Sequence, residues 1–433
     1  MPAPHDSVLV AAPAWPSPAR GWLVVLLLFL AAILAYTDRQ VLSLLVDPIR
    51  SDLRLSDADI ALLMGPAFAL VYGVAGVPLG FAADRVARTR LLMGGIVLWS
   101  LGTIACGMAP DFKSLFAARL VVGLGEAVLS PAAISLIADH FRPERRSLAV
   151  GVYFTGIAIG IGGAILLGAF AIDAVRAGLF AGTALADWAE WRLVLLAVGT
   201  PGLFFAAAFL AVREPARQDD KPATGAAAPA MPLPHFVVSM AALFLAAATA
   251  SLLDNAVGAW APSLLIRQFG MNDADVGRQL GLGLMLGYGG GMLLGGWLAD
   301  AAARRWGSIG KPLVCFAAML ATLPAALFLD AATAGAVLIA VPIYFALSAV
   351  VTASGLSAIV DAAPATQRGA ATAIAFFLNV AIGAGVGPGL VVFIDARLAG
   401  GLGPALSVTV IACYVVAALA LALHLLHKRR HGR

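Results

Sequence analysis

Residues 80–90 read GFAADRVARTR, and a near copy, GWLADAAARR, stands 216 positions later at residues 296–305. Each copy ends a long apolar run, at about residues 58–83 and 274–301, with an aspartate and a group of arginines. A charged segment that follows about 20 or more apolar residues is typical of a chain leaving a membrane. The spaced repetition indicates an internal duplication.

The composition indicates a membrane protein. Of the 433 residues, 61% are hydrophobic and only 12% are charged, whereas soluble domains have about 45–50% apolar and about 25% charged residues. So few charges cannot cover a water-exposed surface, which excludes a soluble multidomain protein, a disordered chain and a coiled coil. The net charge of +4 is not concentrated in a basic domain, so we expect no nucleic-acid partner. Cys106, Cys315 and Cys413 lie far apart in apolar runs, which predicts buried thiols and no metal site.

Twelve apolar runs alternate with charged, proline or glycine-containing segments, and none shows the period-two alternation of a β-barrel strand. They predict an all-α membrane protein with twelve transmembrane helices. The runs lie at about residues 22–46, 58–83, 89–109, 112–139, 146–172, 191–212, 234–266, 274–301, 311–330, 335–361, 367–395 and 404–426.

The basic residues predict the orientation of these helices, because lysine and arginine concentrate in cytoplasmic loops. With the amino terminus inside, 18 of the 28 basic residues fall in cytoplasmic segments and 7 in outer connections. We therefore expect a multi-pass protein of the inner (cytoplasmic) membrane with both termini in the cytoplasm. The segment rich in Ala and Pro at the amino terminus is interpreted as a tail, not a signal peptide.

A polar, proline-rich segment divides the runs six and six. Asp38, Tyr72 and the run Asp57-Ala58-Asp59 all recur 216 positions later. This pattern predicts two parallel, pseudo-symmetric six-helix bundles, an arrangement known for one class of secondary transporter, with a substrate site between the bundles. The predicted parts are a cytoplasmic tail at 1–21, an amino bundle at 22–212, a linker at 213–233, a carboxy bundle at 234–427 and a basic tail at 428–433.

Charged side chains inside the runs are costly, so they are candidates for function. The acids are Asp38, Glu126 and Asp254, and the bases are Arg39 and Arg119. A helical rise of about 1.5 Å per residue places Asp38 and Arg119 at similar depth, and Glu126 on the same helix face as Arg119. An arginine that faces two carboxylates predicts a proton-coupled site, in which protonation of an acid releases Arg119 to an anionic group. The alternative is a structural ion pair that locks the helices.

Asp254 is open to two interpretations. Its position in the repeat favours a role in substrate binding, but its neighbour is Asn255 and not an arginine, which fits a structural or vestigial residue equally well. The glycine runs at residues 160–163 and 281–287 lack the strand and the spacing of nucleotide-binding loops, so we predict that they serve helix packing.

The segment at residues 80–90 is a candidate inner gate. Asp84 is expected to pair with Arg85, Arg88 or a facing helix terminus, and Gly80 recurs with it in the second copy. The alternative is an ordinary positive loop on the cytoplasmic side.

The motif Gly80-x-x-Ala83-Asp84-Arg85-x-x-Arg88-x-Arg90 resembles the loop 2–3 signature of the major facilitator superfamily. Within it the chain resembles the spinster-like lipid transporters, although two of the motifs are shared with symporters of sugar acids. The resemblance implies proton-coupled transport of lysolipids or phosphorylated sphingoid lipids, with Asp38, Arg39, Arg119 and Glu126 in coupling and headgroup binding. The matching pieces are Tyr36-Thr37-Asp38-Arg39, Arg119-x-x-x-Gly123-x-Gly125-Glu126-Ala127 with Pro131, Ser135-Leu136-Ile137-Ala138-Asp139 before Arg145-Arg146, and Trp191-Arg192 through Pro201-Gly202 to Arg213-Glu214-Pro215.

The sequence therefore predicts a monomeric, cofactor-free, proton-coupled transporter of an amphipathic anion. Asp38 and Glu126 are assigned to proton coupling, and Arg119, Arg39 and Asp254 to substrate binding. An organic-anion symporter and a drug:proton antiporter are the alternatives. A polytopic membrane enzyme is disfavoured, because the histidines lie in tails, loops or the ends of the runs and the runs contain no paired catalytic motif.

Overall fold

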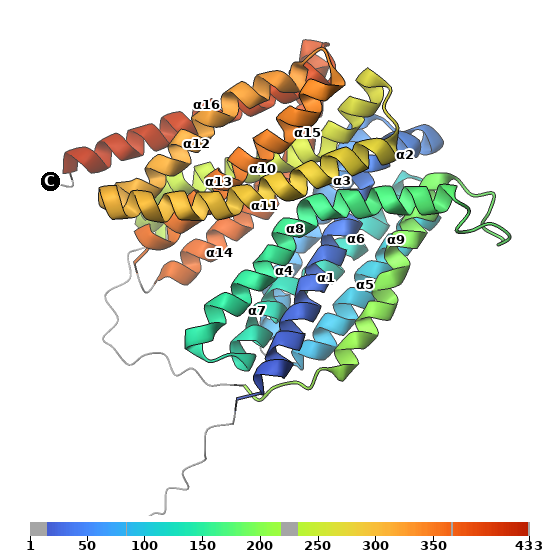
Figure 1. Ribbon diagram of the computed structural model, residues 1–433, viewed down its shortest axis with the longest axis horizontal. Coiled ribbons are helices and arrows are strands. Elements are labelled where there is room, and N and C mark those ends of the chain that lie inside the picture. Colours follow the sequence, from blue (N-terminus) through green and yellow to red (C-terminus); the bar gives the residue numbers. More distant parts are fainter. Residues whose placement is uncertain (1–14, 84, 218–232, 365–366, 432–433) are drawn as a thin grey trace, which may run out of the picture.

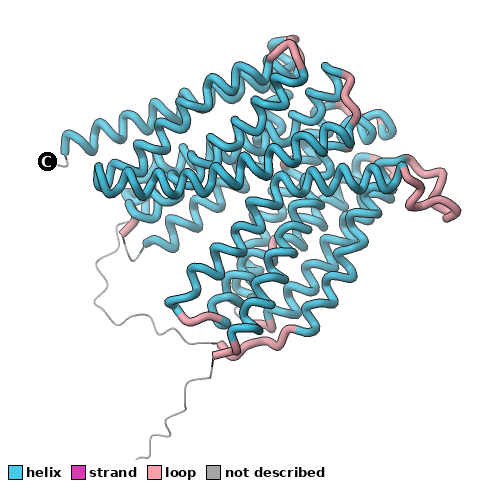
Figure 2. Tube along the Cα trace, in the orientation of Figure 1, coloured by secondary structure: helices cyan, strands magenta, loops and turns pink. Residues whose placement is uncertain are grey.

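The computed structural model describes residues 15–83, 85–217, 233–364 and 367–431, and all the regular structure in these residues is helical (Figures 1 and 2). The amino half contains α1 (Pro18–Leu44), α2 (Val46–Leu53), α3 (Asp57–Met64), α4 (Pro66–Ala83), α5 (Arg88–Met108), α6 (Phe112–Glu126), α7 (Leu129–His140), α8 (Pro143–Arg176), α9 (Glu190–Ala206) and the 3-10 helix η1 (Ala207–Ala211).

The carboxy half repeats this pattern with fewer breaks. It contains α10 (Leu233–Phe269), α11 (Asp273–Trp306), η2 (Gly307–Ile309), α12 (Gly310–Leu327), η3 (Phe328–Asp330), α13 (Ala334–Ala362), α14 (Arg368–Leu378), the π-helical turn η5 (Asn379–Ala384), α15 (Gly385–Leu398) and α16 (Leu402–His431).

Eleven stretches of the described residues are long and apolar enough to cross a membrane. One of them, Asp273–Asp330, contains both α11 and α12, so the chain provides twelve crossings. The predicted fold class, an all-α membrane protein of twelve transmembrane helices, is confirmed.

Local chemistry explains where the helices begin and break. Ser56 and Asp59 form a reciprocal capping box at the start of α3, which pairs amide groups that a helix start leaves free. Gly65 and Pro66 then interrupt this crossing, because proline has no amide hydrogen to continue the helical pattern. The fourth crossing breaks directly after Glu126, at the join of α6 and α7, and this break places a candidate residue at a helix end.

Glycines bring helices of the two halves into close contact. An added Cβ at Gly162 of α8 would lie 2.1 Å from the backbone of Met285 on α11, and one at Gly281 would lie 2.6 Å from the backbone of Leu166. Only residues without side chains permit such an approach. The predicted packing role of the glycine runs is therefore confirmed at these positions.

The helices extend beyond the apolar runs at both ends of the chain. α1 begins at Pro18, within the predicted tail 1–21, and α16 continues to His431, within the predicted tail 428–433. Hydropathy marks where the apolar surface ends, whereas backbone hydrogen bonds continue the helix past that boundary. Residues 218–232 of the predicted linker lie outside the described residues.

We call the end of the molecule that carries Ser17, Arg88 and Glu214 the inner end, and the end that carries Asp47 and Arg267 the outer end. In Figure 1 α8 and α11, which lie close together near the outer end, diverge toward the inner end. Near the outer end α2 and α3 of the amino half lie beside α15 and α10 (Figure 1). The halves are therefore closer together at the outer end than at the inner end.

Candidate functional site

An ion pair between Arg39 and Glu126 lies inside the amino half. The Nη2 of Arg39 on α1 is 2.5 Å from Oε2 of Glu126, and the two side chains are 22% and 1% exposed. Glu126 is the last residue of α6, where the helix dipole is unfavourable for a negative charge. The guanidinium of Arg39 therefore compensates a carboxylate that both burial and the helix end disfavour.

Aromatic rings surround the guanidinium of Arg39. Its Cζ atom lies 4.0 Å from the ring centre of Phe68, 4.8 Å from that of Tyr36 and 5.6 Å from that of Tyr72. Cation–π attraction stabilises this position, more strongly where water is absent. Sequence reasoning missed these three rings as parts of the site, although Tyr36 belongs to a motif that it singled out and Tyr72 to the internal repeat.

Asp38 and Arg119 lie beside this pair without forming an ion pair with each other. Asp38 is 5% exposed, and its Oδ1 has no hydrogen-bond partner among the described residues. Arg119 is 2% exposed, and its Nε donates to the carbonyl of Leu63 at 3.4 Å. Asp38 and Glu126 both interact with Arg119 electrostatically. The structure thus brings the four predicted residues together. It pairs Glu126 with Arg39, whereas the sequence predicts that Arg119 faces both acids.

Asp254 lies in a separate cluster in the carboxy half. Its Oδ1 accepts hydrogen bonds from the hydroxyls of Ser348 at 2.6 Å and Tyr344 at 3.2 Å. The hydroxyl of Tyr414 lies 3.0 Å from that of Ser348. The carboxylate on α10 thus has two hydroxyl donors from α13, and Tyr414 of α16 contacts one of these donors; no described basic residue forms an ion pair with Asp254.

Arg88 is the centre of a buried cluster at the inner end. It forms an ion pair with Asp139, and its Nε donates to Glu214 at 2.7 Å. Nη1 also donates to the hydroxyl of Ser135 at 3.0 Å. The other oxygen of Glu214 accepts from the amide and the hydroxyl of Thr89, each at 3.0 Å. These contacts all lie within the amino half.

The other predicted gate residues make fewer contacts. Arg85 is exposed and its side chain forms no hydrogen bond among the described residues. An added Cβ at Gly80 would lie 4.0 Å from Cβ of Pro131 on α7. Asp84 lies outside the described residues. Glu214 was not predicted as a site residue, although the run Arg213-Glu214-Pro215 was noted.

The pKa of the Glu214 carboxyl is lowered. Partial burial opposes this shift, but the amide of Thr89 and the side chain and backbone of Arg88 outweigh it by favouring the charged carboxylate. Glu214 therefore holds the start of α5 to the chain after η1 as an anion.

Three arginines hold the halves together at the outer end. Arg267 of α10 pairs with Asp47 at 2.6 Å and with Asp57 at 2.8 Å. Arg278 of α11 pairs with Asp173 of α8, and Arg176 of α8 pairs with Asp273 at 2.8 Å. From the sequence, these arginines indicate only the orientation of the helices. Their acids come from segments far apart in the chain, which no local pattern connects.

At the inner end the ion pairs of Arg88 and Lys311 each stay within one half. Lys311 pairs with Asp361 at 2.6 Å and lies 3.9 Å from Asp300, all in the carboxy half. Between the halves, the rings of Phe154 and Phe376 stack with their centres 6.5 Å apart. Charged contacts thus connect the halves at the outer end, where the helices converge.

A family model described as the Major Facilitator Superfamily matches residues 28–388. The chain belongs to the major facilitator superfamily. Its homologues and its fold are those of multi-pass membrane transporters, not of enzymes. The crystal structure of a bacterial homologue of the human lysosomal transporter spinster, inward-facing and unoccupied, superposes with a TM-score of 0.77 at 25% identity and covers 96% of this chain and 98% of that one.

Curated relatives include several kinds of transporter. An efflux pump of Mycolicibacterium smegmatis is 31% identical over 66% of this chain and 64% of its own length. A probable L-galactonate transporter of Escherichia coli is 32% identical over 42% of this chain and 37% of its own length. Human protein spinster homolog 1 is 33% identical over 46% of this chain and 36% of its own length. The matches span less than two thirds of each of these relatives, and they confirm the predicted resemblance to spinster proteins.

Proposed function

We propose that this transporter moves an amphipathic anion, such as a lysophospholipid or a sphingosine-phosphate-like lipid, in exchange for or together with protons. The observation that carries the proposal is the buried pair of Arg39 and Glu126 beside Asp38 and Arg119. Two acids and two guanidinium groups lie close together in a largely buried site, so a change in charge on any one of them affects the rest.

Protonation of Glu126 would remove the negative charge that holds Arg39. The guanidinium is then available to the anionic group of a substrate, and the departing substrate lets the acid ionise again. Asp38 acts on Arg119 in the same way. Phe68, Tyr36 and Tyr72 around Arg39 give the site apolar surface next to the cation, which suits a molecule with a charged head and an apolar chain.

Movement of the halves about the site would expose it to each side in turn. In this proposal the ion pairs of Arg267, Arg278 and Arg176 close the outer end in the inward-facing state, and the Arg88 cluster with Gly80 and Arg85 belongs to the inner gate. The concentration of basic residues at the inner end supports a cytoplasmic location for that end and for both termini.

Transport by purified protein in liposomes tests the proposal. We expect uptake or efflux of a lysolipid that responds to an imposed pH gradient, and a loss of that response in Glu126→Gln. The matched control is Asp187→Asn, which changes an exposed acid in the loop between α8 and α9. A wild-type response to the pH gradient in Glu126→Gln contradicts the coupling.

A sugar-acid symporter is the second candidate, favoured by the likeness to the probable L-galactonate transporter. The same liposomes distinguish the two, with lysolipids, sugar acids and cationic drugs offered separately. Transport of sugar acids with none of lysolipids overturns the lipid substrate but leaves the role of the charged cluster intact. Transport of drugs alone favours the antiporter.

A further inference from the structure

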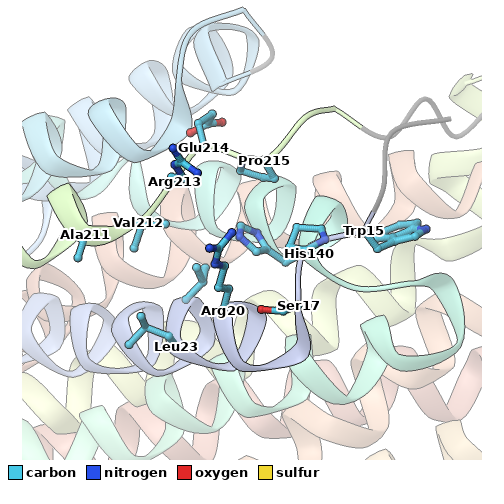
Figure 3. A pocket seen from close by; sticks show the side chains of 12 residues that line it. Trp15, Ser17, Arg20, Leu23, His140, Ala211, Val212, Arg213, Glu214 and Pro215 are labelled. Carbon is cyan, nitrogen blue, oxygen red and sulfur yellow. The ribbon is translucent and has the colours of Figure 1, made fainter. Parts of the chain in front are cut away.

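A cavity of about 390 Å³ opens at the inner end, away from the charged cluster of Arg39 and Glu126. Its walls are the segment before α1 together with the first turns of α1, the last residue of α7, and the end of η1 with the chain that follows it (Figure 3). Trp15, Arg20, His140 and Arg213 are among the side chains that line it. None of these residues has a part in the transport mechanism proposed above.

The cavity carries uncompensated positive charge. Arg20 and Arg213 are exposed, and neither forms an ion pair or a side-chain hydrogen bond among the described residues. The one acid in the lining, Glu214, already accepts bonds from Arg88 and Thr89. Two guanidinium groups at one cavity favour a phosphate, whose oxygens accept paired N–H bonds.

The start of α1 adds donors on the same side. Pro18 occupies its first turn, and Ser17 makes no side-chain capping bond. The amide groups of Ala19 and Arg20 therefore lack partners within the helix. Free amides and the positive end of a helix dipole both attract an anion.

A buried histidine points to the kind of headgroup. His140 is only 5% exposed, and its Nδ1 lies 2.8 Å from the carbonyl of Leu136. A carbonyl only accepts, so Nδ1 donates, and in the neutral ring Nε2 is an acceptor. No described residue bonds to Nε2, and the ring lines the cavity beside Arg20 (Figure 3). A hydroxyl close to the phosphate would supply the missing donor.

The surface next to the cavity is apolar and faces outward. Trp22, Leu23, Leu26 and Leu30 on α1 are 40%, 44%, 51% and 38% exposed. Such residues on a crossing helix contact lipid chains, and tryptophan is typical of headgroup depth. An occupant held by its phosphate at Arg20 can thus lay its acyl chain along α1.

We propose that this cavity binds the headgroup of an anionic phospholipid of the adjacent leaflet, with the phosphate at Arg20 and Arg213 and a headgroup hydroxyl at His140. Phosphatidylglycerol has both groups. The cavity shares Glu214 with the Arg88 cluster, so the bound lipid lies against the inner gate residues.

Native mass spectrometry of the purified protein, titrated with defined lipids, tests this site. We expect phosphatidylglycerol to bind more tightly than phosphatidylcholine, and the double variant Arg20→Gln/Arg213→Gln to weaken it about tenfold or more, because two charged hydrogen-bond donors are lost. The control Arg90→Gln/Arg304→Gln removes the same charge from exposed arginines at the inner end and should bind like the wild type. Equal losses in the two double variants overturn the site.

Two further ligands test the headgroup hydroxyl and the acyl chain separately. Phosphatidylmethanol keeps the phosphodiester but has no headgroup hydroxyl, so we expect weaker binding than for phosphatidylglycerol. Equal binding of the two removes His140 from the site. Inorganic phosphate should compete poorly because it has no acyl chain. Full displacement of the lipid by a matched concentration of phosphate would show a soluble-anion site and refute the lipid.

Discussion

The two halves carry an acid at matching positions, Asp38 on α1 and Asp254 on α10, but surround it with different chemistry. Asp38 lies next to Arg39 and within electrostatic reach of Arg119. Asp254 accepts hydrogen bonds from Ser348 and Tyr344. Hydroxyls stabilise a carboxylate whether or not a cation is present, whereas a guanidinium whose acid becomes protonated is left to another anion. The duplication thus kept the position and changed what the acid can do.

The ion pairs at the inner ends of the two halves also differ, in how deeply their residues are buried. Arg88 is 1% exposed in its side chain and is held by Asp139, which is 10% exposed, and by Glu214, which is 28% exposed. In the carboxy half, Lys311 is 13% exposed and pairs with Asp361, which is 60% exposed. Buried pairs are costly to break, whereas water largely replaces an exposed partner. The amino half therefore contains the more deeply buried ion pairs at the inner end.

The largest expected difference between the halves is in transport. Asp38→Asn should lower proton-driven transport about 100-fold, the effect of losing about 3 kcal/mol of interaction with a buried charge. Asp254→Asn should cost less than about tenfold, because an amide oxygen still accepts from Ser348 and Tyr344. The rates are measured in liposomes with equal amounts of each variant. Equal losses would show that both halves carry the proton.

A smaller difference is expected in stability at the inner end. Arg88→Gln removes the buried cation shared by Asp139 and Glu214 and should lower the free energy of unfolding by about 3–5 kcal/mol. Lys311→Gln should lower it by less than about 1 kcal/mol, since Asp361 is well hydrated. Unfolding in mixed micelles with increasing denaturing detergent measures both. Similar unfolding midpoints for the two variants would show that the ion pairs at the two inner ends contribute equally to stability.

A still smaller effect on stability is expected for the hydroxyl groups that donate to Asp254 in the carboxy half. Tyr344→Phe removes one donor to Asp254 and leaves Ser348 in place, so we expect a loss of about 1 kcal/mol in the free energy of unfolding. The response of transport to a pH gradient should stay as in the wild type. Loss of that response would instead place the Asp254 cluster in the coupling mechanism.

The smallest expected effect is a pH dependence of the stability that the Glu214 carboxyl causes. Because its pKa is lowered in the folded protein, the carboxylate contributes stability above its ordinary pKa near 4.5, and that contribution is lost as the pH falls through the lower, folded value. Thermal unfolding between neutral pH and pH 3 should show this loss in the wild type and not in Glu214→Gln. Asp361→Asn leaves Glu214 intact and serves as the control. A pH profile of stability in Glu214→Gln that matches the wild type contradicts the assignment of this pH dependence to Glu214.

The amino-acid sequence by itself determined the fold class, the number of crossings and the duplication. These depend on the length of the apolar runs, which the thickness of the bilayer imposes locally, and on the spacing of motifs such as those at residues 80–90 and 296–305, which the sequence shows directly. The sequence also identified Asp38, Arg39, Arg119 and Glu126, because a charge within an apolar run is visible without a structure.

Only the tertiary structure decided the partners of these charges. It paired Glu126 with Arg39 and not with Arg119, gave Asp254 two hydroxyl donors from α13, and set Glu214 beside Arg88 across 126 positions of chain. It also joined Arg267 to Asp47 and Asp57 at the outer end. The position of a charge along a helix is a local property, but its partner depends on how distant helices rotate and pack. Helical spacing within one segment does not contain that information.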